Sequence, residues 1–470
     1  MKMGRDHEPL FPSVIQCSLN CRKSQTLVCD FSSLLRSESY FPYFMLVAFE
    51  GGSILRAFFL LLSHPLFFFL NFELQIKVMI FITFCGLRFK DIDLVSRAVL
   101  PKFYLENLNY LVYKILASCG SKKVFTIMPR VMVEGFLKEY IKVDTVKATE
   151  LHSIGKYYSG FLSNSGFLAK HRALKEQFAY VIHKEDRKAS SRTIMPREKY
   201  PKPLIFHDGR LAFLPTPLAS LIMFLWLPLG ILLAFFRFFS VIFLPPKLAI
   251  FMLSLSGVIL EFNLSKSMPS EKEKSGVLYV GNHRTLLDPI ILSLALEKPL
   301  TTVTYSLSRF SELLAPIRTK RLTRDRNQDA KTIIQLLNEG DLVVFPEGTT
   351  CREPYVLRFS SLFAELTEHI VPVTFNVGID MFYPTTANGL KWLDAIFGAM
   401  NPRPYCSIEI LDKVPKECTV GGGRSIHEVA NYVQKEIADA LGFECTNLTR
   451  RDKYLMLTGN EGVVQERKKF

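Results

Sequence analysis

Apolar residues are distributed along this chain in two ways, as short runs that end in polar loops and as one long run almost free of charge. The short runs at residues 277–280 (VLYV), 342–345 (LVVF) and 370–373 (IVPV) are typical of buried strands. Apolar strand-like and helical segments also alternate from residue 26 to about residue 179. The pattern predicts two α/β domains, one in each half of the chain.

The long apolar run lies between these domains and predicts a membrane segment. Residues 218–236 are nineteen residues without a charge, ended by Arg237, and a second apolar run continues to residue 244. This length is sufficient for a helix to cross a bilayer. Pro228 and Gly230 are expected to kink the helix, and the prolines at 245–246 to end it. A kink equally allows a re-entrant or interfacial hairpin, and a buried core helix is the remaining alternative.

An earlier apolar stretch, residues 41–72, is interrupted by Glu50, Arg56 and His64. Its uncharged part, residues 57–72, is short for a membrane span, so we expect a pair of interfacial helices or a buried cap. Residues 1–13 contain acidic residues and no apolar core, so no cleavable signal peptide is predicted.

Composition narrows the class of partner. The net charge of +14 and the pI near 9.2 favour an anionic partner. Because 49% of the residues are hydrophobic and the mean hydropathy is +0.18, we expect a lipid bilayer and no nucleic acid. The nine cysteines are scattered without paired metal-ligand spacing, so we interpret them as reduced thiols that are cytosol-facing or buried.

The most specific motif is G-N-H-R-T-L-L-D-P at residues 281–289. It predicts a loop between a strand and a helix, since Pro289 suits a first helical turn and Asp288 is a favoured N-cap. In such a loop the Asp288 carboxylate can meet the His283 imidazole and fix its tautomer. With no Ser or Cys nucleophile nearby, the pair suggests a base that acts directly on a substrate hydroxyl. The alternative is an N-cap aspartate beside an ordinary loop histidine.

Three further segments follow this motif in order. Residues 318–326 (RTKRLTRDR) hold five cations in nine residues, which taken alone indicates a solvated or membrane-facing basic patch. Residues 342–354 (LVVFPEGTTCREP) run from an apolar strand into a polar loop, where Gly348 lets backbone N–H groups approach an anion. Residues 370–373 predict a strand that either lines an acyl pocket or builds the core.

These four segments resemble, in order and spacing, the four sequence blocks of the glycerolipid acyltransferase family. The extended motifs are similar to those of the land-plant glycerol-3-phosphate acyltransferases. They read N-H-R-T-L-L-D-P, R-L-T-R-D-R and F-P-E-G-T-T-C-R-E-P. The resemblance covers residues of about 200–455 strongly and of about 25–200 more loosely. It implies a membrane-bound enzyme that moves a fatty acyl group from acyl-CoA to a hydroxyl, expected to be sn-2, of glycerol 3-phosphate. The lysophosphatidic acid formed would supply glycerolipid or cutin- and suberin-type polyester synthesis, with acyl-CoA as co-substrate and neither another cofactor nor a metal.

The resemblance also assigns roles to residues. His283 would be the general base, and Asp288 would orient it. The substrate-binding residues would be Arg284, Arg321, Arg324, Glu347, Gly348 and Thr349. Arg324 would hold the glycerol phosphate, because a planar guanidinium can bind two phosphate oxygens at once. Glu347 would orient a glycerol hydroxyl or an arginine, or else simply occupy a turn.

The first domain resembles the haloacid-dehalogenase-like phosphatase module of plant members of this family. Its apolar strand is followed by Asp30-Phe31-Ser32, so the nucleophile position is retained while Ser32 replaces the general acid. Thr126 would bind phosphate. The Lys and Mg²⁺-binding Asp motifs expected between residues 161 and 203 are not recognisable, which would leave the phosphate charge uncompensated. We therefore predict a pseudophosphatase kept for structure or for docking membrane and substrate.

These features predict the domain plan. It consists of a disordered leader (1–24), the haloacid-dehalogenase-like domain (25–200), a membrane-embedded helical hairpin (201–265), the acyltransferase domain (266–455) and a basic tail (456–470). The expected location is the endoplasmic reticulum membrane with the active site facing the cytosol, and a mitochondrial membrane is less favoured. Two alternatives remain, a bifunctional enzyme that also removes the phosphate to give 2-monoacylglycerol, and a non-catalytic membrane scaffold.

Overall fold

The apolar runs of the two halves become strands of two separate sheets in a computed structural model that describes residues 26–37, 39–163, 194–264, 276–305 and 317–461. The chain forms two compact units, one extending to His207 with Leu214–Ile222 added, the other comprising Asp208–Phe213 and the chain from Met223. Both units mix helices and strands, which confirms the predicted α/β content. The predicted leader and the last nine residues of the basic tail lie outside the described residues.

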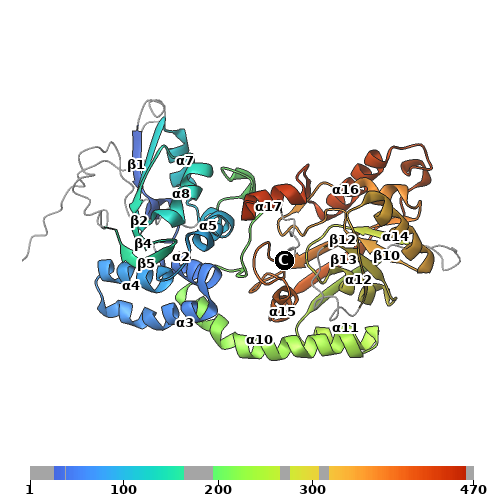
Figure 1. Ribbon diagram of the computed structural model, residues 1–470, viewed down its shortest axis with the longest axis horizontal. Coiled ribbons are helices and arrows are strands. Elements are labelled where there is room, and N and C mark those ends of the chain that lie inside the picture. Colours follow the sequence, from blue (N-terminus) through green and yellow to red (C-terminus); the bar gives the residue numbers. More distant parts are fainter. Residues whose placement is uncertain (1–25, 38, 164–193, 265–275, 306–316, 462–470) are drawn as a thin grey trace, which may run out of the picture. The chain divides into compact units, whose positions relative to one another are not determined.

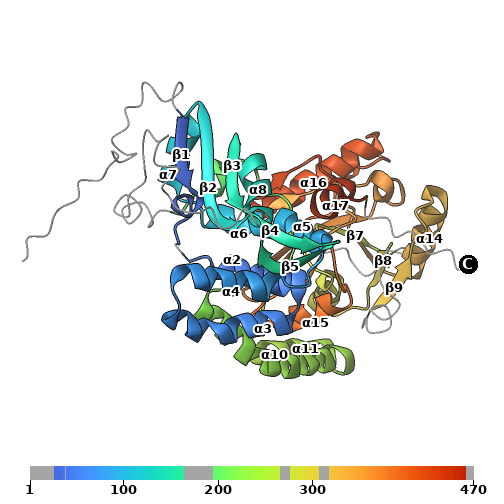
Figure 2. The same ribbon diagram turned by 60° about the vertical axis from the view of Figure 1, so that its left-hand side comes forward.

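The first unit is built on a small parallel sheet in the order β1-β2-β3, formed by Thr26–Asp30, Ser121–Pro129 and Thr145–Thr149. An antiparallel hairpin of β4 (Leu151–Ile154) and β5 (Tyr157–Leu162) follows it. Figures 1 and 2 show helices surrounding both elements of this unit.

The predicted alternation of strands and helices fails between β1 and β2, where the chain is almost wholly helical. The helices there are α1 (Phe31–Leu34), α2 (Phe41–Leu46), the π-helix Val47–Gly52, α3 (Ile54–Ser63), the 3-10 helix His64–Phe69, α4 (Phe72–Phe84), α5 (Phe89–Ala98), α6 (Leu100–Glu106) and α7 (Tyr110–Ser118). Helix α8 (Arg130–Glu139) comes after β2. Apolar runs of more than about ten residues favour helices over strands, and the apolar stretches in this region are of that length.

The stretch 41–72 combines the two alternatives that the sequence left open. Every residue of α2 is buried, as a cap would be. By contrast, α3 and the 3-10 helix after it expose large apolar side chains, with Phe68 and Phe69 at 81% and 88% exposed. These two elements therefore present an apolar surface to the surroundings.

The second unit contains a seven-stranded sheet in the order β6-β13-β12-β7-β10-β8-β9. The five strands from β12 to β9 run parallel, whereas β13 is antiparallel to β12 and parallel to β6. The strands are β6 (Ile259–Leu264), β7 (Leu278–Gly281), β8 (Thr301–Thr304), β9 (Arg318–Arg321), β10 (Leu342–Val344), β12 (Ile370–Gly378) and β13 (Tyr405–Ile410). A short pair, β11 (Tyr355–Val356) and β14 (Glu444–Cys445), lies apart from this sheet.

Helices cover both faces of this sheet. They are α11 (Pro246–Leu255), α12 (Asp288–Leu296), α14 (Arg326–Glu339), α15 (Leu393–Ala399), α16 (Ile426–Leu441) and α17 (Arg450–Thr458). Leu278 and Val280 of β7 share a core with α14 and α16, whereas Tyr279 packs with α12 on the opposite face. A central parallel strand is buried on both faces in this way, which explains its continuous apolar run.

The long apolar run forms α10 (Pro217–Phe243), and it is not broken at Pro228 as a hairpin would require. Proline removes only its own N–H, and the remaining helical hydrogen bonds on either side keep the helix continuous. The chain leaves the helix at Leu244–Pro245, and α11 begins at Pro246. Among the described residues, α10 is the one helix long and apolar enough to cross a membrane, which by itself is weak support for a span.

Candidate active site

The two loops that carry the sequence motifs meet because β7 and β10 are neighbouring parallel strands. Val280 pairs with Val344, so the loops that follow these strands leave the same edge of the sheet. The backbone N–H of Cys351 donates to the carbonyl of His283 at 2.8 Å and joins the loops directly. Open α/β sheets bind their ligands at this carboxyl edge.

The first loop is fixed to β12 where it begins. A Cβ atom on Gly281 would lie 2.6 Å from the Phe375 ring, so only glycine permits this close approach. The Asn282 side chain then bonds both backbone groups of Phe375, accepting at 2.8 Å and donating at 2.9 Å. These contacts position the next residue, His283.

His283 and Asp288 are paired as the motif predicts. The imidazole Nδ1 lies 2.9 Å from Oδ2 of Asp288, whose side chain is fully buried. The carboxylate also accepts the N–H groups of Arg284 at 2.6 Å and Thr285 at 2.9 Å, and the Thr285 hydroxyl at 2.6 Å. The predicted N-cap is wrong by one residue, because Leu287 is the cap and Asp288 begins α12. From that position the carboxylate reaches back to the loop instead of forward into the helix.

Glu347 holds the same loop from the other side. Its carboxylate accepts the backbone N–H of His283 at 2.8 Å and that of Leu357 at 3.2 Å, and its side chain is buried. Burial raises the pKa of Glu347 to about 8, against the lowering by these two donors and by Arg284 and Lys453. The geometry shows that this glutamate orients the backbone beneath the imidazole.

Arg284 is turned away from the cavity into the loop after β10. Its guanidinium donates to the backbone carbonyls of Cys351, Arg352 and Glu353 at 2.7–2.8 Å. The side chain therefore fixes the shape of the 351–353 segment. Cys351 is buried, and burial raises its thiol pKa to about 12, so the thiol stays protonated at neutral pH.

Gly348 and the two threonines after it form the wall of the cavity next to Glu347. Gly348 has φ of +64°, a conformation that other residues adopt only with strain. The Lys453 ammonium, from α17, donates to the Thr350 carbonyl at 2.6 Å and lies 3.3 Å from the hydroxyls of both Thr349 and Thr350.

The two arginines expected in the second block lie at the exposed rim. Arg321 ends β9, and Arg324 has φ of +71° with its guanidinium 5.9 Å from the ring centroid of Tyr305, which lines the cavity. Asp329 fixes this turn by accepting the N–H groups of Thr323 and Arg324. Among the described residues of the basic run, the charged side chain that lines the cavity is that of Arg326.

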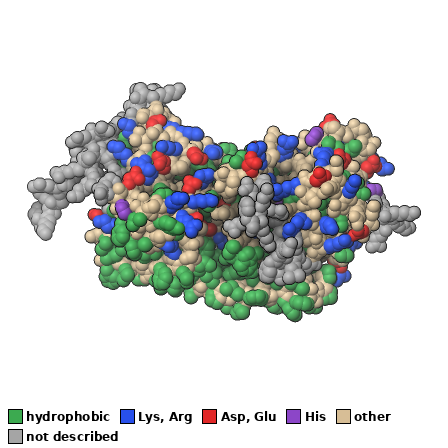
Figure 3. All heavy atoms as spheres, viewed as in Figure 1, with side chains coloured by type: hydrophobic (Ala, Val, Ile, Leu, Met, Phe, Trp, Pro, Cys, Tyr) green, Lys and Arg blue, Asp and Glu red, His purple; other side chains and the backbone are tan. Residues whose placement is uncertain are grey.

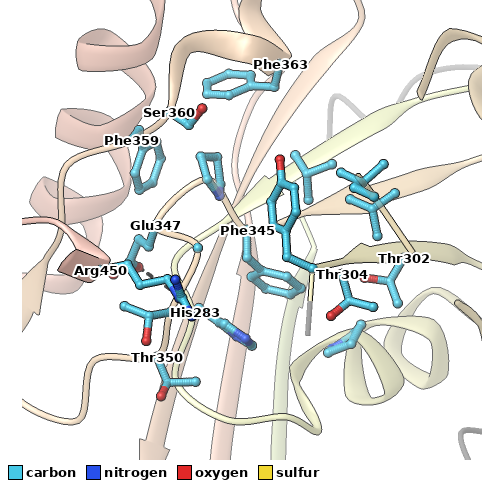
Figure 4. Close-up of a pocket in the computed structure, with 18 of the residues that line it drawn as sticks. His283, Thr302, Thr304, Phe345, Glu347, Thr350, Phe359, Ser360, Phe363 and Arg450 are labelled. Carbon is cyan, nitrogen blue, oxygen red and sulfur yellow. Dashed lines mark hydrogen bonds between the residues drawn. The ribbon is translucent and has the colours of Figure 1, made fainter. Parts of the chain in front are cut away.

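These residues surround a cavity of about 730 Å³ with two chemically different parts (Figure 4). His283, Glu347, Thr350 and Arg450 gather on one side of the view, and Thr302 and Thr304 of β8 lie on the other. His283 stacks on Phe345, with ring centroids 4.4 Å apart. The apolar lining includes Val303, Ile317, Leu322, Ile333, Phe359 and Phe363. Charged and apolar side chains thus line one cavity together with the imidazole.

The fourth block builds the core. Ile370 of β12 packs with α14 and α16, whereas Val371 and Val373 pack with α12. None of the residues 370–373 is among those that line the cavity. This observation decides between the two interpretations that the sequence left open.

Sequence reasoning missed the residues that α17 and its surroundings contribute, notably Lys391, Arg450 and Lys453. They lie 40 to 100 residues beyond the glutamate loop and carry no motif of their own. The available signal was the capping pattern Thr449-Arg450-Arg451-Asp452, which predicts a helix beginning with two cations.

In the first unit, Asp30 ends β1 and Thr126 lies within the neighbouring strand β2. Asp30 pairs with Phe125, the residue before Thr126, and its carboxylate accepts the backbone N–H of Ser32 at 2.7 Å. The Thr126 hydroxyl accepts the N–H of Met128 at 3.1 Å. No cluster of metal-ligating side chains occurs among the residues that the structure describes, and the expected lysine and aspartate motifs fall mostly within 164–193, outside them.

Two family models match separate parts of this chain. Residues 26–202 match the family described as the haloacid-dehalogenase-like domain of RAM2-like glycerol-3-phosphate acyltransferases, and residues 261–376 match the acyltransferase family. The protein is therefore an acyltransferase enzyme with a haloacid-dehalogenase-like N-terminal domain.

Similarity over nearly the whole chain defines the family further. Glycerol-3-phosphate acyltransferase 1 of Arabidopsis thaliana is 53% identical over 97% of this chain and 87% of its own length. Glycerol-3-phosphate acyltransferase RAM2 of Petunia hybrida is 45% identical over 92% of this chain and 96% of its own length. The chain belongs to the glycerol-3-phosphate acyltransferase family.

Among solved structures, the 1-acyl-sn-glycerophosphate (LPA) acyltransferase PlsC from Thermotoga maritima is 20% identical over 42% of this chain and 76% of its own. Its TM-score of 0.29 is too low to support any structural argument.

Proposed function

We propose that this enzyme transfers a fatty acyl group from acyl-CoA to the sn-2 hydroxyl of glycerol 3-phosphate and releases lysophosphatidic acid with its phosphate retained. The observation that carries the proposal is the His283–Asp288 pair, set at 2.9 Å, whose imidazole lines a cavity with both charged and apolar side chains. The names of the similar proteins supply the acceptor.

His283 acts as a general base in this proposal. Because Nδ1 faces Asp288, Nε2 is the nitrogen that takes the proton from the glycerol hydroxyl. The hydroxyl oxygen forms a bond to the thioester carbonyl carbon, and the carbon–sulfur bond then breaks. The imidazolium, stabilised by Asp288, returns its proton to the departing CoA thiolate. No acyl-enzyme is required, and the high thiol pKa of Cys351 agrees with a direct transfer.

Acyl-CoA and the acceptor approach from different ends of the cavity. The apolar lining formed by α14, β8 and residues 359–363 suits the fatty acyl chain. The cationic end suits the phosphate of the acceptor. By resemblance, Arg324 would hold the phosphate with Arg321 as a helper, and Gly348 and Thr349 would contribute to the same site.

The haloacid-dehalogenase-like domain is proposed to be a pseudophosphatase. Ser32 stands where the general acid is required, and a serine hydroxyl cannot protonate a leaving alkoxide at neutral pH. In addition, the Asp30 carboxylate caps α1 through the Ser32 N–H. The phosphate of the product would then survive, which separates this activity from one that yields 2-monoacylglycerol.

Membrane attachment is proposed to occur through one face of α10. On its inner face, Trp226 donates to the Met400 carbonyl at 2.7 Å, and the Arg237 guanidinium donates to the Ala399 and Asn401 carbonyls at 2.8 and 2.6 Å. Arg237 lies eleven positions after Trp226, so about 16 Å of helix lies along this segment of the acyltransferase unit.

The outer face of α10 is apolar. Its large side chains are exposed, among them Leu225, Leu232, Phe235 and Phe239 at 67%, 67%, 70% and 56%. Figure 3 shows hydrophobic side chains gathered along the lower edge of the second unit, where α10 and α11 lie. A helix attached by one face and apolar on the other favours in-plane insertion over crossing. We place this face on the endoplasmic reticulum membrane, with the active site towards the cytosol.

Product analysis tests the proposed function. Membranes containing the full chain would be incubated with an acyl-CoA and glycerol 3-phosphate labelled in both the glycerol and the phosphate, and the lipids separated by thin-layer chromatography. We expect lysophosphatidic acid carrying both labels and acylated at sn-2. Monoacylglycerol without the phosphate label would indicate the bifunctional alternative, and no labelled lipid at all would indicate a scaffold.

A further inference from the structure

The charged end of the cavity is shaped by α17, a helix that lies beyond residues 261–376, the region that matches the acyltransferase family. Arg450 and Lys453 are three residues apart and therefore project from the same side of this helix. Both line the cavity that contains His283. The His283 imidazole and the two cationic side chains therefore line the same cavity.

Hydrogen bonds and burial hold Lys453 in place in this cavity. Its side chain is 7% exposed, and its ammonium bonds to the 349–350 segment directly after the motif glycine. Lysine is rarely buried unless its charge serves a purpose, because removing an ammonium from water is costly. The two threonine hydroxyls beside it add further hydrogen-bonding groups.

Arg450 lines the same cavity as His283 and lies beside the glycine of the motif. Its Cδ is 4.0 Å from the position that a Cβ on Gly348 would occupy, and its guanidinium lies 4.7 Å from the centroid of the Tyr454 ring. Figure 4 shows the end of the Arg450 side chain beside His283 and Glu347. Lys391 donates to the Tyr454 hydroxyl at 2.9 Å and adds a third cation to this end.

The balance of charge along the cavity favours an anion. Its lining has six cationic side chains against two carboxylates, the cations being Arg326, Arg358, Lys391, Arg450, Arg451 and Lys453. The two carboxylates are committed elsewhere, since Glu347 accepts two backbone N–H groups and Asp394 pairs with Arg210 at 2.7 Å. The side chains, and not the helix terminus, create the attraction, because a capping box of Thr449 and Asp452 satisfies the start of α17.

We propose that Arg450 and Lys453, assisted by Lys391 and the hydroxyls of Thr349 and Thr350, bind the phosphate monoester of the acyl acceptor in its reacting position. This inference rests on the proposed function. Guanidinium and ammonium groups supply charge-assisted hydrogen bonds to phosphate oxygens. Arg324 at the rim would then act in recruitment and not in the reacting complex.

The position next to the base identifies which phosphate is bound. In acyl-CoA, the whole pantetheine arm separates the phosphates from the thioester, so they lie far from His283 when the thioester carbonyl is placed for attack. In glycerol 3-phosphate, the phosphate is attached to the carbon next to the one that bears the sn-2 hydroxyl. A phosphate held by Arg450 therefore brings the sn-2 hydroxyl to the imidazole ahead of the terminal hydroxyl.

Steady-state kinetics of two variants test the inference. Arg450→Gln and Lys453→Met would be compared with the wild-type full chain in membranes, with glycerol 3-phosphate and acyl-CoA varied in turn. We expect the KM for glycerol 3-phosphate to rise by roughly 10- to 100-fold in each, as for loss of one charge-assisted hydrogen bond. The KM for acyl-CoA should stay within about twofold, which also reports an intact fold.

Matched controls remove the same charges elsewhere in the unit. Arg424→Gln and Lys435→Met change exposed cations that do not line the cavity, and they should leave both KM values unchanged. Arg324→Gln should raise the KM for glycerol 3-phosphate less than Arg450→Gln does. Lys453 is buried, so Lys453→Met could yield no folded protein. In that case Arg450→Gln, at a partly exposed position, tests the inference by itself.

The outcomes separate this inference from the proposed function. An inactive wild-type enzyme would refute the proposed function. An active wild type with a raised KM for acyl-CoA in the variants would assign the cations to CoA and overturn the inference. It is also overturned if both KM values stay normal, if only turnover falls, or if Arg324→Gln has the larger effect. Inorganic phosphate offers a second readout, since its inhibition against glycerol 3-phosphate should weaken in both variants.

Discussion

Two buried carboxylates set the position of His283 from opposite sides. Asp288 bonds its imidazole, and Glu347 bonds its backbone N–H. Each carboxylate also accepts further backbone donors, so the loop has little freedom to move. A general base must stay within hydrogen-bond reach of the proton that it takes, and misplacement by about 1 Å can cost about a hundredfold in rate. The motif residues therefore act as one positioning device around a single imidazole.

The pairing of His283 with Asp288 was predictable, because a strand-loop-helix pattern brings residues five apart together. The roles of Arg284 and Glu347 were not. Both contact backbone groups of a loop about sixty residues away, and no local pattern encodes such partners. Their charges suggested substrate binding, whereas their hydrogen bonds are to the protein's own backbone.

The pH dependence of kcat/KM for glycerol 3-phosphate should follow the ionisation of the Lys453 side chain. Burial lowers the pKa of Lys453 to about 8, an effect that Arg352 and Lys391 increase and that Cys351 and Asp208 oppose. The side chain is charged below this pH and neutral above it, so kcat/KM for glycerol 3-phosphate should fall by about tenfold per pH unit above pH 8.

A charge-retaining variant isolates the lysine in this measurement. Glu347, with a pKa that burial raises to about 8, titrates in the same range and faces the same cluster. An arginine at position 453 stays charged over this pH range. The decrease of kcat/KM for glycerol 3-phosphate above pH 8 should therefore be smaller in Lys453→Arg. An unchanged pH profile in Lys453→Arg would show that another group causes it.

At the scale of elements, α10 shows where sequence patterns succeed and fail. Its existence and its end were predictable from a long apolar run followed by two prolines. The kink expected at Pro228 does not interrupt the helix, which continues through this residue. The packing of Trp226 and Arg237 on residues 399–402 depends on contacts far along the chain, which an apolar run alone cannot reveal.

The proposed in-plane attachment of α10 predicts a topology. With epitope tags at the two ends of the full chain in sealed microsomes, external protease should remove both tags if α10 lies in the membrane surface. The protein should nevertheless stay in the pellet after carbonate washing, because the apolar face is buried in lipid. Protection of one tag until the vesicles are permeabilised would instead show that the chain crosses the bilayer.

A change confined to the outer face tests the same surface. Replacing Leu225, Leu232, Phe235 and Phe239 by glutamine should release a larger share of the protein into the supernatant, provided that no other segment holds it. Burial of each such side chain contributes about 1.5–3 kcal/mol. The control is Phe262→Gln on β6, which removes an apolar side chain from outside this face.

At the scale of the whole molecule, the two units are expected to differ in chemistry. Asp30→Ala should leave acyl transfer unchanged, and no phosphate should be released from lysophosphatidic acid by either form. Ser32→Asp alone should not create phosphatase activity, because the metal-binding motif is not recognisable in the sequence. Phosphate release that Asp30→Ala abolishes would establish a bifunctional enzyme.

The α/β content of both units and the family could be predicted from the sequence, since four ordered motifs are specific. The order of the seven strands and the contribution of α17 could not. Strand order depends on which apolar faces pack together, and α17 reaches the cavity only after the chain has folded back over the sheet edge. Residues such as Lys453 are therefore recognisable only in the folded protein.

His283 is proposed to be the general base that activates glycerol 3-phosphate for acyl transfer. The measurement is the turnover number of His283→Ala in membranes at saturating acyl-CoA and glycerol 3-phosphate, with protein amount and membrane insertion matched to wild type. His152→Ala, an exposed histidine in the first unit, is the control for the same chemical change. For His283→Ala we expect the turnover number to fall by at least about 10²-fold with little change in the KM for acyl-CoA, and we expect normal turnover in His152→Ala. Near-normal formation of lysophosphatidic acid by His283→Ala would contradict it.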